Sequence, residues 1–406
     1  MKVLQINCVY NSGSTGKIIC DICNGLKNKS IETVVCYGRG KRVHEPNVYK
    51  VSTELEAKIH SAFWRLFGVQ FGFSPIATAK TIKIIKKEKP DVVHLHCLNG
   101  NFINVYKLLE FLKKENIKTV LTLHAEIMHT AGCEHAMDCE KWKIECNNCP
   151  KINGKFSKYF RDDAKHCYNK MKKAFDGFKD LTVIGVSEWL TERAKLSPIF
   201  PKNTHFETAH NGINTEIFTK SNFEELYEKY SIPRDKKIIL HATPNFNHPI
   251  KGGKYVLEAA RKLPDYQFII VGFNGDESIL PENVLPINHT KDKEEMAKFY
   301  SLADVTLLTS KRETFSMVVA ESLSCGTPVV GFEAGAPETI TIPEYSLFSE
   351  YGNVELLCEN IEKIATTEFD KQELSDKART KYDLKSMTEK YIIIYKKIKN
   401  QLKRIG

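Results

Sequence analysis

Short apolar segments rich in Val, Ile and Leu alternate along the chain with segments whose apolar residues recur every three or four positions. This alternation predicts parallel strands connected by covering helices. Strands are expected at 3–7, 33–37, 91–96, 119–124 and 181–187, and again at 237–242, 267–272, 305–310 and 327–332. Helices are expected at 17–27, 79–89, 105–114, 254–262, 293–302 and 317–325.

The length of 406 residues exceeds what one ordinary core accommodates, so two domains are expected. The predicted fold class is α/β, with two Rossmann-like, doubly wound domains facing a central cleft where such sheets bind ligands. The domains are placed at 1–204 and 205–382. Residues 383–406 carry apolar side chains at helical spacing, which predicts a packed terminal helix and not a membrane anchor: Met387, Tyr391, Ile394 and Ile398.

Hydrophobic residues make up 42% of the chain and charged residues 27%, which are values of a folded globular protein. No apolar run approaches the roughly 18 residues of a spanning helix, and the N-terminal residues become polar too soon for a signal peptide. We therefore expect a cytoplasmic protein. Its 12 cysteines are then first interpreted as thiols or metal ligands.

The net charge of +9 is concentrated in one half of the chain. Residues 1–200 contain 32 Lys and Arg against 20 Asp and Glu, a balance of +12, whereas the remainder carries −3. A basic half suits an anionic partner such as a membrane surface, a phosphate-bearing lipid or nucleic acid. Lysines used only for solubility explain the charge equally well.

The most specific segment of the sequence is 310–330, where Glu313 and Glu321 are separated by seven residues. Glu313 is expected in the loop after a strand, and Glu321 about one turn inside the following helix. The backbone amides of Ser316, Met317 and Val318 then form the N-terminus of this helix, which suits a diphosphate. Without further context the two glutamates could equally flank an ordinary strand-to-helix turn.

The segment resembles the signature of the family 4 retaining glycosyltransferases, which have the GT-B fold. The two glutamates and the sequence Cys-Gly-Thr-Pro-Val-Val at 325–330 carry this resemblance, which extends over nearly the whole chain. It implies that Glu313 contacts the donor sugar and that Glu321 contacts the nucleotide ribose. Phe315 belongs to the same implied donor-binding stretch.

Other positions match the same family. Gly13 and Gly16 follow the first strand and open the first helix, in a spacing that is not a P-loop and that alone indicates only a tight turn. Lys251 precedes two glycines, and the resemblance implies that it binds the donor pyrophosphate. The family usually adds an arginine shortly before this lysine, whereas residues 242–248 contain none.

Asn211 and Gly212 resemble the family's motif at the junction between domains, which implies a place close to the donor. His124 ends a predicted strand, where the family has a histidine that contacts the donor sugar. A lone histidine at a strand end is otherwise more often structural. The family often continues with aspartate, whereas this chain has Ala125 followed by Glu126.

The reaction implied is retaining transfer of a sugar from a nucleoside-diphosphate sugar, with Glu313, His124 and Lys251 as the catalytic residues. No metal or other cofactor is expected in the chemistry, since Lys251 and the helix amides would stabilise the leaving diphosphate. The expected acceptor is a glycan or a polyprenyl-diphosphate-linked oligosaccharide, without nucleic acid as a partner. The alternatives are a catalytically silent GT-B scaffold and a zinc-knuckle protein that binds nucleic acid.

Four cysteines cluster in a predicted insert at 129–150, spaced C-x5-C-x6-C-x2-C: Cys133, Cys139, Cys146 and Cys149. They could bind a structural zinc ion, form two disulfides or remain thiols. A similar insert marks a subgroup of capsule and exopolysaccharide glycosyltransferases, which implies a role in polysaccharide biosynthesis. Because the insert follows His124, we expect it near the acceptor.

The stretch 58–67 mixes aromatic and basic residues, and more lysines follow at 80–89. It predicts a peripheral contact with the inner face of the plasma membrane around Trp64. The alternative is that Phe63, Trp64 and Phe67 pack in the core, as aromatic side chains usually do.

Overall fold

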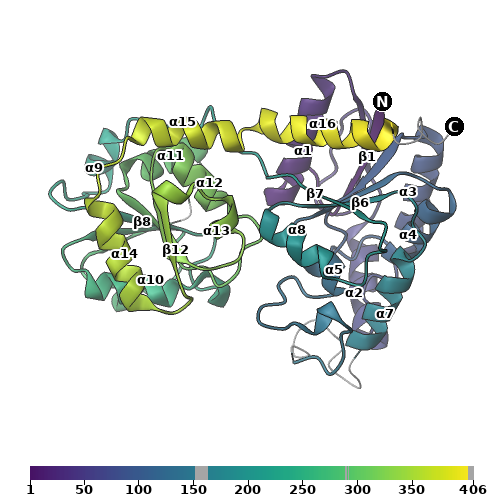
Figure 1. Cartoon of the computed structure of the whole chain (residues 1–406), viewed down its shortest axis with the longest axis horizontal. Coiled ribbons are helices and arrows are strands. Elements are labelled where there is room, and N and C mark those ends of the chain that lie inside the picture. Colours follow the sequence, from purple (N-terminus) through teal and green to yellow (C-terminus); the bar gives the residue numbers. More distant parts are fainter. Residues whose placement is uncertain (151–162, 289, 291, 401–406) are drawn as a thin grey trace. The chain divides into compact units, whose positions relative to one another are not determined.

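The computed structural model describes residues 1–150, 163–288, 290 and 292–400 (Figure 1). The chain forms two compact units, one made of Met1–His210 with the segment from Met387 onward, the other of Asn211–Ser386. The boundary lies at 210/211, six residues after the expected 204/205. The reason is β7 (His205–Thr208), which pairs with β6 (Leu181–Gly185) and so belongs to the first unit.

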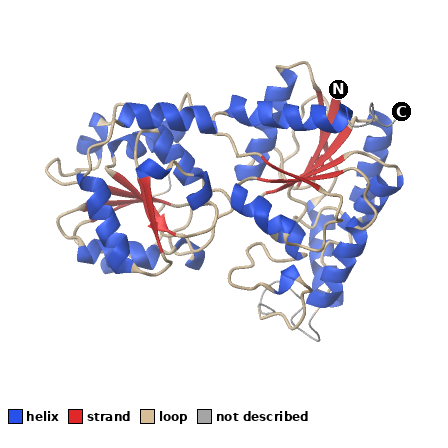
Figure 2. Cartoon of the chain, in the orientation of Figure 1, coloured by secondary structure: helices blue, strands red, loops and turns tan. Residues whose placement is uncertain are grey.

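The first unit contains a parallel sheet of seven strands in the order β3-β2-β1-β4-β5-β6-β7. Helices enclose this sheet in Figure 2. Besides β6 and β7 its strands are β1 (Lys2–Asn7), β2 (Glu32–Tyr37), β3 (Val48–Lys50), β4 (Val92–Leu95) and β5 (Thr119–Leu123). The helices of residues 1–210 are α1 (Gly13–Lys27), α2 (Glu54–Phe67), α3 (Pro75–Glu88), α4 (Val105–Lys114), α5 (Ile127–Thr130), the 3-10 turn η1 (Lys141–Lys143), α7 (Ala164–Phe175) and α8 (Glu188–Lys195).

The second unit contains a parallel sheet of six strands in the order β10-β9-β8-β11-β12-β13. The strands are β8 (Ile238–Ala242), β9 (Gln267–Val271), β10 (Val284–Ile287), β11 (Val305–Leu308), β12 (Val329–Phe332) and β13 (Ser346–Ser349). The helices are α9 (Glu224–Lys229), α10 (Gly253–Lys262), α11 (Lys293–Leu302), α12 (Met317–Ser324), α13 (Pro337–Ile340), α14 (Val354–Thr366) and α15 (Lys371–Tyr382), with 3-10 turns η2 (Pro249–Lys251), η3 (Glu277–Ile279) and η4 (Pro343–Tyr345).

All nine predicted strands are confirmed within two residues, and both doubly wound sheets were therefore predictable. The strands that the pattern missed are β3, β7, β10 and β13, which are the outer strands of the two sheets. An outer strand pairs on one side only and is partly exposed, so its residues need not be uniformly apolar. The residues of β3 and most of β7 are half-buried, in contrast to the fully buried β4, β5 and β6.

The last helix, α16 (Leu384–Asn400), packs against the first unit from Met387 onward. In Figure 1 it is the yellow helix that lies next to β1 and α1. The four apolar residues expected to pack are all buried: Met387, Tyr391, Ile394 and Ile398. The packed terminal helix is thus confirmed for residues up to 400. In the described part of the chain, no helix has both the length and the apolar character needed to cross a bilayer.

Candidate active site

In the second unit, Lys251 and Glu313 meet at the carboxyl ends of two neighbouring strands. Lys251 ends η2, in the connection that follows β8, while Glu313 follows β11, and these two strands pair in parallel. The Lys251 Nζ lies 2.7 Å from the Glu313 Oε1, and both side chains are partly buried. Two residues that the sequence placed in separate motifs therefore form one ion pair at the edge of the sheet where ligands bind in this fold class.

The backbone around Glu313 is held by the loop after β12. The Glu313 N–H donates to the Ala334 carbonyl at 2.9 Å, and the Ala336 N–H donates to the Glu313 carbonyl at 3.3 Å. The carboxylate of Glu338 in turn accepts from the amides of Ala334 and Gly335. Burial raises the pKa of Glu338. Sequence reasoning missed this glutamate; the signal available was Pro-Glu at the first helical positions after a strand.

The lysine is fixed by a tight turn at Gly252. This residue has a φ of +69°, and a Cβ built on it would lie 2.1 Å from the Thr309 carbonyl oxygen. The Thr309 hydroxyl also donates to the Lys251 carbonyl at 2.8 Å. Only glycine combines a positive φ with room for the Thr309 carbonyl at this position, which explains why a glycine follows Lys251.

Helix α12 begins directly after these residues with an uncapped N-terminus. Its first turn contains no acidic residue, and the Ser316 side chain makes no capping hydrogen bond. Ser316 has a φ of +85°, which is unusual for a residue other than glycine. Phe315 is buried, while Met317 and Val318 are half-buried. A helix N-terminus without an acidic or capping side chain suits an anion, and diphosphate binding by these amides stays a prediction.

Glu321 lies one turn further along α12 and has an unusual protonation state. The Tyr300 hydroxyl donates to its Oε2 at 3.1 Å. Burial raises the pKa of Glu321 to about 7, against a smaller lowering by this hydrogen bond. The carboxyl group of Glu321 therefore changes its charge near neutral pH instead of in the usual acidic range.

At the carboxyl edge of the first sheet, His124 belongs to a buried chain of hydrogen bonds. Its Nε2 lies 3.1 Å from the His96 Nδ1, and the His96 Nε2 lies 2.7 Å from the Gln5 Oε1. The Gln5 amide donates to the Tyr395 hydroxyl at 3.3 Å. With the Gln5 oxygen facing His96, the His96 Nε2 carries the proton, so His96 Nδ1 accepts from His124 Nε2.

Burial keeps these histidines neutral. It lowers the pKa of His124 to about 4 and that of His96 well below its usual value, with His94 adding to the effect on His96. A neutral His124 with its proton on Nε2 has an acceptor at Nδ1. The structure thus places the predicted histidine at the expected strand end, and the orientation of the Gln5 amide favours the tautomer with the proton on Nε2.

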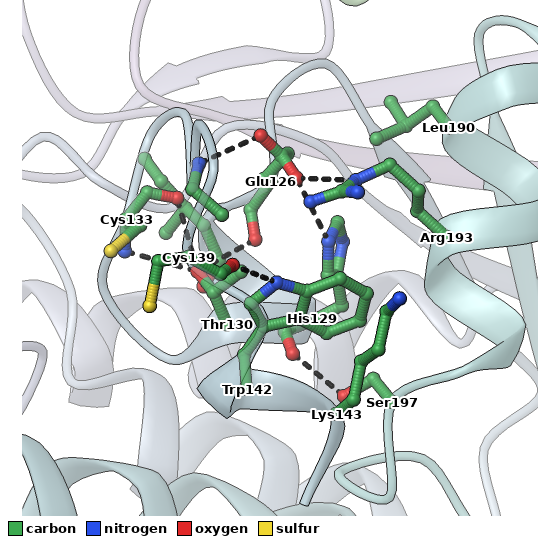
Figure 3. Close-up of polar contacts among 12 residues, drawn as sticks. Glu126, His129, Thr130, Cys133, Cys139, Trp142, Lys143, Leu190, Arg193 and Ser197 are labelled. Atoms are coloured by element: carbon green, nitrogen blue, oxygen red, sulfur yellow. Dashed lines mark hydrogen bonds and ion pairs between the residues drawn. The ribbon is translucent and has the colours of Figure 1, made fainter. Parts of the chain in front are cut away.

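The loop after His124 is fastened by Glu126, which is completely buried (Figure 3). Its carboxylate accepts from the Arg193 Nε and from the Ala136 N–H, both at 2.8 Å. Burial opposes ionisation of Glu126, but hydrogen bonding with His129 and the charge of Arg193 outweigh it and lower its pKa to about 2. Because burial lowers the pKa of His129, this histidine is neutral at pH 7, and Arg193 is the positively charged partner of Glu126. Glu126 ties the cysteine-rich insert to α8.

The other residues predicted to bind the donor lie in two places, at the start of α1 and at the start of the second unit. Gly13 begins α1 and is exposed, whereas Gly16 is buried in the first turn. Asn211 is buried at the start of the second unit. A Cβ on Gly212 would lie 2.9 Å from the Leu384 Cα, so the close approach of the returning chain explains this glycine. Its role near a donor stays a prediction.

Comparison with known proteins shows which class of protein this fold and site belong to. The family model described as Glycosyltransferase Family 4 matches residues 15–217, and that described as Glycosyl transferases group 1 matches residues 222–381. The fold is also that of an Anabaena protein, HepE, solved in complex with UDP, with a TM-score of 0.67 and 15% identity over 98% of this chain and 100% of that one. The two parallel α/β units define a glycosyltransferase of the GT-B type.

Two relatives align over nearly their whole length. The N-acetyl-alpha-D-glucosaminyl L-malate synthase of Bacillus anthracis is 22% identical over 97% of this chain and 96% of its own. The putative colanic acid biosynthesis glycosyl transferase WcaC of Escherichia coli K12 is 22% identical over 98% of this chain and 100% of its own. With both family models matched, the chain belongs to glycosyltransferase family 4.

Proposed function

We propose that the protein is a retaining glycosyltransferase that moves a hexosyl group from a nucleoside-diphosphate sugar to a growing bacterial polysaccharide. The Lys251–Glu313 pair carries this proposal, since it lies beside the uncapped start of α12 at the carboxyl edge of the second sheet. The relative named for colanic acid biosynthesis supports a polysaccharide product such as capsule, exopolysaccharide or O-antigen.

In the proposed reaction, the bond between the sugar C1 and the diphosphate oxygen breaks while the acceptor oxygen bonds to C1 on the same face. The departing phosphate oxygen takes the proton of the acceptor hydroxyl. Lys251 has three donor hydrogens, so it can keep Glu313 and also bind the developing charge on the diphosphate. Glu313 positions the sugar, and the resemblance to the family adds His124 as a predicted contact of the donor sugar.

The test first measures nucleotide binding and then measures turnover of the matching sugar nucleotide. Thermal shifts with UDP, GDP, ADP and CMP identify the nucleotide, because binding to the folded state raises the melting temperature. UDP is the first candidate, since it is bound in the Anabaena structure. Glu313→Gln should then lower hydrolysis or transfer of the matching sugar nucleotide about 10²- to 10³-fold while keeping diphosphate affinity within a few-fold.

The exposed Glu333→Gln, directly after β12, serves as the matched control and should keep full turnover. Nucleotide binding with no turnover in any sugar nucleotide would instead identify a silent scaffold. Absence of binding to every nucleotide would contradict the proposal as a whole.

We further propose that the first unit contacts an anionic bilayer that carries a lipid-diphosphate-linked acceptor. One face of α2 exposes apolar side chains at helical spacing, with Leu55 68%, Ile59 47% and Leu66 73% exposed. Of the three aromatic residues for which core packing was the alternative, Phe67 is 53% exposed, whereas Phe63 and Trp64 are half-buried. Lys58 and Arg65 are exposed on the same helix. Apolar residues flanked by cations are typical of an interfacial helix, and each lysine adds about 1 kcal/mol near anionic lipid.

Co-sedimentation with phosphatidylglycerol and phosphatidylcholine vesicles tests this contact. Binding should be limited to the anionic vesicles and should weaken in high salt. Leu66→Ser with Phe67→Ser should reduce it, whereas Ile393→Ser, which removes a 61% exposed apolar residue on α16, should not. Lack of binding to anionic vesicles at low salt would reject the membrane contact and leave the transferase proposal intact.

A further inference from the structure

The four cysteines of the insert surround one small cavity. This cavity has a volume of about 20 Å³, and Cys133, Cys139, Cys146 and Cys149 all line it together with Thr130, Trp142 and Ala164. Each of the four side chains is half-buried. A space of this size accommodates a single small ion or one water molecule. Residues separated by up to 16 positions in the sequence are thus gathered around one point.

The insert has almost no regular structure of its own. Within residues 131–150, all of which the structure describes, the one regular element is η1. Side-chain hydrogen bonds shape the rest: the Cys133 N–H donates to the Thr130 hydroxyl at 3.0 Å, and the Trp142 indole donates to the Cys139 carbonyl at 2.8 Å. Figure 3 shows the sulfur atoms of Cys133 and Cys139 pointing to the same side of Thr130. A loop without a core of its own is the usual context of a structural metal ion.

No carboxylate or imidazole side chain is among the described residues that line this cavity. Of the nearby carboxylates, Glu126 binds Arg193, Glu140 pairs with Lys143, and Glu145 pairs with Lys165. A fifth cysteine, Cys167, packs beside Cys146 and Cys149, but its Sγ donates to the Gly68 carbonyl at 3.3 Å and it does not line the cavity. The metal-binding side chains that line the cavity are therefore the four cysteines, and a set of four sulfur atoms selects zinc over magnesium or calcium.

The charge around the cavity fits a thiolate site. Four thiolates on Zn²⁺ carry a net charge of −2, which favours a nearby cation. Lys141 lines the same cavity, with its Nζ donating to the carbonyls of Asn147 at 3.1 Å and Asn148 at 2.9 Å. These bonds also fasten the turn between Cys146 and Cys149.

We propose that Cys133, Cys139, Cys146 and Cys149 bind one structural zinc ion. As the side chains are placed in the described residues, no group of three or more His, Cys, Asp or Glu could hold a metal ion. Binding therefore requires the thiols to rotate toward the cavity and to release their four protons to solvent. The ion would connect cysteines that lie before and after Ala136 in the insert. The Ala136 N–H donates to Glu126, and Glu126 lies two residues after His124.

Metal analysis of protein purified without added metal tests the site. We expect about one zinc per chain and four cysteines that resist alkylation until a chelator is added. Cys139→Ser and Cys146→Ser should each lower the zinc content to background. Cys20→Ser on α1 is the matched control, since this half-exposed cysteine lies outside the insert and should leave the zinc content unchanged.

Cobalt substitution covers the case in which the serine variants fail to fold. The wild-type chain loaded with Co²⁺ should show the intense near-ultraviolet thiolate charge-transfer band and the visible bands of a tetrahedral site. Freshly purified protein that contains no zinc and whose four cysteines react at once would overturn the proposal. Mass spectrometry showing two disulfides among these cysteines would do the same.

Discussion

The Nε2 of His124 lies 3.1 Å from the Nδ1 of His96, and both rings are shielded enough to stay neutral. Since the pKa of His124 is about 4, its ring should show no titration between pH 5 and 8 in NMR spectra. The unfolded chain binds protons on this residue near pH 6.5, so its contribution to stability is lost as the pH falls from about 6.5 toward 4. A titration of His124 centred near 6.5 would contradict the buried network.

The tautomer of His124 gives a second measurement from the same network. The 15N shifts should identify a protonated Nε2 and an unprotonated Nδ1. Gln5→Leu removes the acceptor of the His96 proton and should change this pattern, while Asn24→Leu on the exposed side of α1 should not. An unchanged tautomer in the Gln5 variant would show that the hydrogen-bond chain does not determine it.

Nucleotide affinity should depend on the protonation of Glu321. If its carboxylate accepts hydrogen bonds from the ribose, binding favours the charged form. With a free-state pKa of about 7, affinity should then rise about tenfold between pH 6 and 8, with release of a proton below pH 7. Glu321→Gln should weaken binding and remove this pH dependence, as calorimetry in buffers of different ionisation enthalpy can measure. A wild-type pH profile in the Gln variant would exclude the role.

Glu338 should act as a positioning residue for Glu313. Glu338→Ala leaves the Ala334 and Gly335 amides without their acceptor, which should cost about 1–3 kcal/mol of unfolding free energy and lower turnover. Glu338→Gln keeps an acceptor oxygen and should retain most of the unfolding free energy and most of the turnover. Denaturant unfolding and steady-state kinetics decide this. Equal losses in the Ala and Gln variants would show that charge and not the hydrogen bonds matters.

The Glu126–Arg193 pair should contribute strongly to the stability of the insert, in addition to the proposed zinc ion. Arg193→Leu leaves a buried carboxylate without its cation and should cost about 3–5 kcal/mol, part of which Glu126→Gln in the same chain should recover. Because the folded pKa of Glu126 is about 2, this stabilisation is present above about pH 4.5 and is lost as the pH falls toward 2. Lys195→Ala, at the exposed end of α8, is the control. A loss no larger in Arg193→Leu than in this control would contradict the prediction.

The sequence by itself determined the interior of both sheets and the donor segment. Strands such as β1, β5 and β8 are buried along all or nearly all of their length, so most of their residues are apolar and the strands are recognisable locally. The spacing of Glu313 and Glu321 likewise depends only on a strand-to-helix turn of fixed length. These features are short-range, and a local pattern is sufficient to specify them.

Tertiary structure decided the contacts between residues far apart in the chain. Lys251 and Glu313 are 62 positions apart in the sequence, and His94 and Tyr395 are 301 positions apart, so no local pattern indicates their hydrogen bonds. The same holds for the outer strands, for the domain boundary at 210/211 and for the return of α16 to the first unit. Each of these features depends on which surfaces pack together after folding. A strand that pairs on one side only, or a hydrogen bond between distant residues, does not require a particular pattern of apolar residues in the sequence around it.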